Sequence, residues 1–407
     1  MHDRHSPVAA ANALTARWAQ ACAGGSVAMA GAGAWPLLAY LAAAATGPAR
    51  TELLDAVGTD AATASQAART VLSIMDGSPA IRSALGLWSR PDLPLRPTWT
   101  ATLPSGMFGE LTSDLAADQR RLDRWAHERT GGLIPTMPLQ LTDDTLLVLA
   151  MALTVRTTWL RPFTEDIGGF DTGPWAEREI HVLSRSTRVL DRARIADTPA
   201  GPLTLLRVMG TGGIDVHLLL GEESMKPAHV LTAGIDVLAG RHPSTGVDVL
   251  GVGEPGPGLT VRLVRDHTPD DALNVTVPRF TVTSEHDLLD LPQVFGLATV
   301  TDVTHGHLPG VSPVPLAVTQ ARQNVVASFE ATGFESAALT AVGAVGAGPA
   351  PRPPYRVRHV GLDYARPFGF LTVDRRSHLI LTAGWIDEPE TIKAEHLTAD
   401  PAAPACT

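Results

Sequence analysis

The sequence predicts a single large domain of the α+β class, built on extended β-sheets. Segments with helical spacing dominate the first third of the 407-residue chain, and strand signals dominate its second half. With 44% hydrophobic residues, the chain can bury a large core, which excludes a disordered protein. No change in composition marks a domain boundary, and no internal repeat is present.

Periodic apolar residues predict the main helices. They cover residues 12–23, 37–47, 50–58 and 118–132, and a short one follows at 287–296. Glycines directly follow two of them, as is typical of helix ends. The uncharged run 26–45 is long enough to suggest a membrane span, but it is rich in Ala and Gly and contains Pro36. We therefore interpret it as a buried strand followed by a helix and expect no membrane association.

Runs of β-branched and apolar residues predict the strands. Residues 84–90 are the first predicted strand, and the nearly continuous apolar run 144–159 is typical of a strand buried on both faces. Seven further segments share this character: 203–210, 214–221, 259–266, 273–285, 324–331, 368–375 and 377–387.

Charge and cysteine content exclude several classes of function. The net charge of −10 and a pI near 5.8 argue against nucleic acid as a partner, because phosphate binding needs a basic face. Cys22 and Cys406 are too few for a disulfide framework and lack metal-ligand spacing. His305 and His307 are close enough for a metal pair, but no third ligand follows nearby, so a solvated loop is favoured. We expect no metal and no other cofactor.

No motif in the chain singles out a catalytic residue. Neither a nucleophile elbow nor a phosphate-binding loop occurs, so an enzyme is the less favoured class. The N-terminus lacks a positive region followed by an apolar one, which predicts a cytoplasmic protein, with secretion left open.

Several segments match one family in the right order. They are the central strand with its Trp and Arg-Pro-Phe turn (146–163), a Pro-Arg-Phe strand with the helix after it (273–297), a Gly-x-Glu-Ser-Ala-Ala hinge (326–342) and a C-terminal strand pair (362–389). In these segments the chain resembles a serpin, a member of the serine protease inhibitor superfamily. The Ala-, Gly- and Pro-rich composition is typical of a GC-rich genome, and we expect a bacterial member of the family.

The resemblance implies a serpin fold with three β-sheets, about nine helices and an exposed reactive-centre loop. The domain would cover residues 12–389, with the loop at about 331–358. A flexible N-terminus (1–11) and a C-terminal tail (390–407) would flank it. Serpins trap a protease that cuts the loop, because the cut loop then inserts into the main sheet as a new strand.

The hinge of this loop would be formed by Gly333, Phe334, Glu335, Ser336, Ala337, Ala338, Leu339 and Thr340. Alternate residues from Phe334 would point inward on insertion, and those from Glu335 outward. Small inward residues suit insertion. Phe334 stands where inhibitory members have a small residue, and added bulk in a packed site typically costs ~1–3 kcal/mol.

Other positions are carried over from the same resemblance. Trp159 would lie at the top of the main sheet, in the region called the breach. Below the centre of the sheet, the region called the shutter would contain four residues that replace the family's two Ser, Asn and His: Ala30, Gly33, Met151 and Gln323. Counting about fourteen residues from the hinge places the cut at Ala347–Gly348. Counting back from Pro367 places it near 355–356.

Three functions remain open at this stage. The first is inhibition of a serine or cysteine protease. The target would be an elastase-like or subtilisin-like enzyme that prefers small residues, and the inhibitor would be a monomer. The second is a non-inhibitory binding protein for a small molecule or another protein. The third is a serpin scaffold recruited to an enzymatic step of biosynthesis.

Overall fold

The helices lie mostly in the first third of the chain, as predicted. The computed structural model describes residues 6–334 and 353–390, except residues 106, 113, 133, 138, 140, 144 and 177. Within these ranges the α-helices are α1 (Pro7–Gln20), α2 (Gly31–Ala44), α3 (Gly47–Val57), α4 (Ala61–Asp76), α5 (Pro97–Thr100), α6 (Leu115–Thr130), α7 (Pro227–Leu238) and α8 (Pro292–Phe295). None of them is long and apolar enough to cross a membrane.

Local signals account for several helix ends. The hydroxyl of Ser6 accepts a hydrogen bond from the Ala9 N–H (3.1 Å), so α1 begins at Pro7 rather than at residue 12. Gly58 and Gly131 follow α3 and α6 with φ of 62° and 65°, a conformation that favours glycine. The run 26–45 forms a strand and a helix, as predicted, although α2 begins at residue 31 and contains Pro36.

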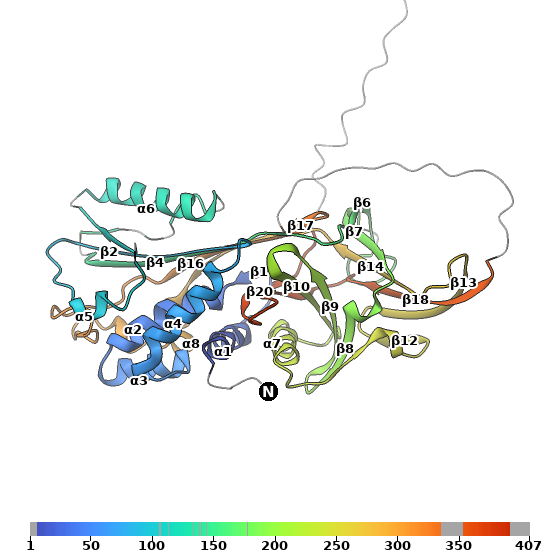
Figure 1. Cartoon of the computed structure of the whole chain (residues 1–407), viewed down its shortest axis with the longest axis horizontal. Coiled ribbons are helices and arrows are strands. Elements are labelled where there is room, and N and C mark those ends of the chain that lie inside the picture. Colours follow the sequence, from blue (N-terminus) through green and yellow to red (C-terminus); the bar gives the residue numbers. More distant parts are fainter. Residues whose placement is uncertain are drawn as a thin grey trace, which may run out of the picture.

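Two large sheets form the centre and one end of the molecule (Figure 1). The seven-stranded sheet has the order β1 (Val27–Met29), β20 (Ile380–Ile386), β19 (Phe368–Asp374), β10 (Ile214–Gly221), β9 (Gly201–Met209), β8 (Ala193–Thr198) and β11 (Ser244–Gly246). The six-stranded sheet has the order β12 (Gly253–Gly256), β13 (Leu259–Asp266), β18 (Tyr355–Asp363), β14 (Ala272–Pro278), β7 (Ile180–Thr187) and β6 (Thr164–Gly168).

The third predicted sheet is divided into separate ladders. These are β3 (Phe108–Glu110), β2 (Ile81–Ser89) and β4 (Leu147–Val155); β15 (Phe280–Asp287) with β16 (Arg322–Phe329); and β5 (Thr157–Thr158) with β17 (Gly333–Phe334). In Figure 1 they form one layer, with α6 on one face and α2 to α4 on the other. Below, this layer is called the divided sheet.

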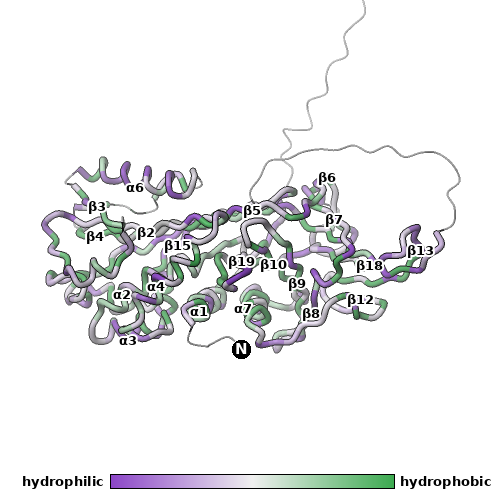
Figure 2. Tube along the Cα trace, viewed as in Figure 1, coloured by the Kyte–Doolittle hydropathy of each residue, from purple (hydrophilic) through white to green (hydrophobic). Residues whose placement is uncertain are grey.

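Amphipathic helices cover the sheets. Along α6 hydrophilic and hydrophobic residues alternate, whereas α7 is mostly hydrophobic (Figure 2). Leu122 and Ala126 of α6 are buried against the β2–β4 ladder.

Aromatic side chains join the divided sheet to the seven-stranded sheet. Phe280 and Phe329 stack with centroids 5.4 Å apart, and Phe280 also lies 5.4 Å from Phe370 of β19. All three are buried. The position of β16, which borders the candidate site, is therefore fixed by the core.

Candidate functional site

The divided sheet contains a gap between β4 and β16. Within the described residues, no backbone ladder joins these two strands. At their C-terminal ends they are close, because the N–H of Trp159 donates to the carbonyl of Thr332 (2.9 Å). At their N-terminal ends, Leu147 and Gln323 line one cavity. The strands therefore run side by side in the same direction, and in the described part of the chain backbone hydrogen bonds connect the segments that follow them only at the C-terminal end.

The start of the predicted hinge lies at that joined end. Gly333 and Phe334 form β17, which pairs antiparallel with Thr158 and Thr157 of β5. A Cβ at Gly333 would lie 2.4 Å from the carbonyl oxygen of Thr157, so only glycine fits this ladder. The other hinge residues, 335–340, and the candidate scissile residues, Ala347 and Gly348, are outside the described ranges.

Trp159, the predicted breach residue, lies beside β17. Its side chain is 4% exposed, and its ring centroid is 4.8 Å from that of Phe329. The indole N–H donates to the carbonyl of Glu330 (2.8 Å). Trp159 thus fixes the turn between β16 and β17, the strand that contains the first two hinge residues.

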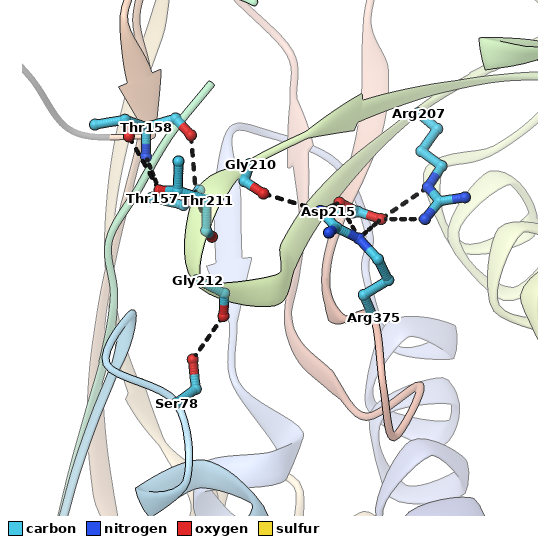
Figure 3. Close-up of polar contacts among 9 residues, drawn as sticks. All are labelled: Ser78, Thr157, Thr158, Arg207, Gly210, Thr211, Gly212, Asp215 and Arg375. Carbon is cyan, nitrogen blue, oxygen red and sulfur yellow. Dashed lines mark hydrogen bonds and ion pairs between the residues drawn. The ribbon is translucent and has the colours of Figure 1, made fainter. Parts of the chain in front are cut away.

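A polar network connects β5 to the β9–β10 turn (Figure 3). The hydroxyl of Thr157 donates to the carbonyl of Thr211 (2.9 Å), and the N–H of Thr158 donates to the hydroxyl of Thr211 (3.3 Å). The hydroxyl of Ser78 donates to the carbonyl of Gly212 (3.0 Å). These hydrogen bonds therefore fix the position of β5, the strand with which Gly333 and Phe334 pair.

The same turn is anchored by a buried carboxylate. Asp215 is 2% exposed and forms ion pairs with Arg207 (2.7 Å) and Arg375 (2.5 Å). Arg375 also donates to the carbonyl of Gly210 (2.9 Å), as Figure 3 shows. Burial opposes ionisation of Asp215, but the hydrogen bonds and charges of the two arginines outweigh it and lower the pKa of the carboxyl.

The structure brings together three of the four predicted shutter positions. The Gln323 amide accepts from the Ala30 N–H and donates to the Ala30 carbonyl, both at 3.0 Å. A Cβ at Gly33 would lie 3.2 Å from the Gln323 nitrogen, so the small residue leaves room for the longer side chain. Met151 pairs through its backbone with Leu85 in the β2–β4 ladder, and its side chain is outside the described part.

Two further polar residues belong to this region and were not singled out by sequence reasoning. The Ala28 N–H donates to the hydroxyl of Ser284 (2.8 Å), and His286 Nε2 donates to the Ala28 carbonyl (2.6 Å). His286 lies opposite Gln323 in the β15–β16 ladder. Alternation in the predicted strand 273–285 and its extension would place Ser284 and His286 on one face, which is the signal that could have identified them. A polar cluster is thus present here, built from other residues.

The alternative cut position near 355–356 is not accessible as an extended loop. Tyr355 and Arg356 are the first residues of β18 and pair with Asp266 and Arg265 of β13. A residue inside a ladder is not free to enter a protease active site.

The histidine pair lies on a loop with one carboxylate. His305 Nδ1 lies 2.9 Å from Asp302 Oδ2, and the His305 side chain is 75% exposed. Across the described ranges, no group of three His, Cys, Asp or Glu residues has the geometry of a metal site.

Known proteins share this architecture. The insect protein Serpin48 from Tenebrio molitor superposes with a TM-score of 0.69 at 16% identity, covering 94% of this chain and 98% of its own. The chain has the serpin fold. Human thyroxine-binding globulin, solved as a complex with thyroxine, gives a TM-score of 0.68 at 14% identity, covering 94% of this chain and 97% of its own.

A sequence comparison agrees with the serpin fold. A rice protein (Oryza sativa subsp. japonica) described as "Putative serpin-Z6C" is 25% identical over 393 residues, 87% of this chain and 88% of the relative. No family model matches the sequence. The rice relative and the serpin neighbours together support the serpin superfamily.

Proposed function

We propose that this serpin-fold protein inhibits a serine protease by cleavage of its loop and insertion of the cut loop between β4 and β16. One observation supports this most directly. β4 and β16 lie side by side without a ladder in the described residues, and Gly333–Phe334 already pairs with β5 at their joined end. Strand edges that lack partners offer backbone donors and acceptors to an added strand.

The length of the loop suits this insertion. Continuing the antiparallel register of Phe334 and Thr157 would place Ala344 opposite Leu147, the first residue of β4. Residues 335–344 would then fill the gap, and the inward members of this segment are small. Ala347–Gly348 would lie beyond it, which is where the cut must be if the protease is to be carried along. The target would be an elastase-like or subtilisin-like protease with a small binding pocket.

The test is incubation of the full chain with subtilisin and with pancreatic elastase. Inhibition by insertion predicts a covalent complex that survives denaturing electrophoresis. It also predicts that the melting temperature of the cleaved protein rises by tens of degrees. Cleavage without either result would refute the proposal.

A matched pair of variants sharpens this test. Ala338→Arg puts a long charged side chain on the inward face, where it should convert the inhibitor into a substrate. Ala337→Arg changes the outward face and should leave the complex intact. Equal behaviour of the two variants would argue against strand insertion.

Binding without inhibition is the second candidate. The residue that favours it is Phe334, whose bulk stands at the first position to be inserted. Thyroxine-binding globulin, which has the same fold, is described in complex with a small molecule. Cleavage with no covalent complex and no rise in melting temperature would favour this candidate.

A further inference from the structure

An apolar cavity of about 460 Å³ lies between α2 and the starting ends of β4 and β16. Its wall consists of one face of α2, residues 139, 141 and 145–148, the segment 315–323, and four single residues: Leu288, Leu297, Val303 and Leu308. Protein interiors are normally packed without such voids, so a cavity of this size needs an explanation. Its volume is in the range of small-molecule sites.

The chemistry of the wall defines what it can hold. Leucines are the commonest lining residues, and none of the described lining residues is aromatic or acidic. The single lining cation, Arg322, is paired with Asp287 at 3.2 Å. The Gln323 amide is bonded at both ends to Ala30. A charged ligand would therefore find no unpaired counter-charge among the described lining residues, whereas a neutral apolar one would contact mainly leucines.

We propose that this cavity binds a neutral aliphatic molecule, such as a long-chain or isoprenoid alcohol. At the roughly 30 Å³ that one water molecule occupies in the liquid, the volume corresponds to on the order of fifteen water-sized groups. Val303, Pro315 and Thr319 are exposed lining residues, so they lie at its mouth. The Thr319 hydroxyl can meet the polar end of the ligand there, while the aliphatic part contacts the leucines of α2.

The experiment uses the intact full chain and the neutral fluorescent probe N-phenyl-1-naphthylamine. We expect one saturable site with increased probe fluorescence. 1-Dodecanol should displace the probe at a concentration at least tenfold lower than dodecanoate, which has the same chain length but a charge. Absence of saturable binding, or equal displacement by the two competitors, would overturn the proposal.

Three variants locate the site. Leu141→Trp adds bulk inside the cavity, and Val303→Glu places a charge at its mouth, on a side chain that is 74% exposed and does not support the core. Both should weaken probe binding at least tenfold. Leu160→Trp changes a 55% exposed leucine that does not line the cavity and should bind as the original chain does. Unchanged affinity in both cavity variants would place the probe elsewhere. These measurements use the uncleaved chain, so they stand whether or not the protein proves to be an inhibitor.

Discussion

His286 lies opposite Gln323 in the β15–β16 ladder. The His286 side chain bonds to the backbone of β1, and the Gln323 side chain bonds to the backbone of the residue that precedes α2. His286 donates to Ala28, and Gln323 bonds to both polar groups of Ala30. The two residues therefore connect one half of the divided sheet to the elements beneath it. If β16 moves away from β4, either Ala28 and Ala30 move with β15 and β16 or these hydrogen bonds break.

Gln323→Ala should lower the free energy of unfolding by about 1–3 kcal/mol, because it leaves the buried N–H of Ala30 without its partner. The Ala30 carbonyl loses the Gln323 amide but still accepts from the N–H groups of Gly33 and Ala34. Urea unfolding measures this loss. Asn324→Ala is the matched control on the next residue, since the Asn324 side-chain oxygen is buried without a hydrogen-bond partner. The control should lose less than about 1 kcal/mol. Equal losses would mean that the Gln323–Ala30 bonds contribute nothing specific.

Gly333→Ala should break the β5–β17 ladder, because the new methyl group would collide with the backbone of Thr157. We expect faster hydrogen exchange in β5 and a destabilisation of about 1–3 kcal/mol. Gly251→Ala is the control, since a Cβ there meets nothing within 4 Å. It should be neutral or slightly stabilising. Unchanged exchange in Gly333→Ala would show that the ladder tolerates a side chain.

Asp215→Asn should destabilise the protein at pH 7 by about 2–4 kcal/mol, since it removes the partner of Arg207 and Arg375, which are each about one-third exposed. The pKa of Asp215 is lowered in the folded state, so its contribution is present above about pH 4 and is lost as the pH falls below that. The difference between the variant and the original chain should therefore shrink toward pH 3 in urea unfolding. Asp236→Asn, which breaks an exposed pair with Arg241, should cost less than about 1 kcal/mol.

His217 should make the protein less stable as the pH falls from 7 to 4.5. Burial lowers the pKa of this imidazole to about 4, and the charges of Asp215, Arg207 and His378 act on it as well. Its contribution is complete above the unfolded pKa, near 6.5, and is lost as the pH falls toward the folded value. His217→Gln should flatten the dependence of the melting temperature on pH in this window. An unchanged profile in His217→Gln would contradict the prediction.

An occupant of the apolar cavity should oppose complete insertion of the loop. The cavity borders Leu147, which the inserted strand would reach at about residue 344, so ligand and strand compete for the same end of the gap. Saturating 1-dodecanol should therefore raise the number of inhibitor molecules consumed per protease at least twofold. Val303→Glu should abolish this effect. No change in stoichiometry would mean that the two processes are independent.

Local patterns in the sequence predicted many of the elements of this protein, although not α4 or α7, and some of the residues at their ends. Apolar periodicity, Gly58 and Gly131 at helix ends, and the long apolar run 144–159 predicted helices and strands that the structure contains. The family motifs predicted the serpin fold. Such features depend on residues close together in the chain, so a single sequence is sufficient to identify them.

Tertiary structure alone decided how the distant parts meet. The pairing of Gly333 with Thr158, the gap between β4 and β16, and the cavity at its end join segments more than 150 residues apart. The sequence predicted the replacement of the usual polar residues beneath the sheet, but not the new partner, His286. Which side chain faces Gln323 depends on the register of the β15–β16 ladder. That register is set by packing of the whole core, such as the stack of Phe280 on Phe329, and not by local propensity.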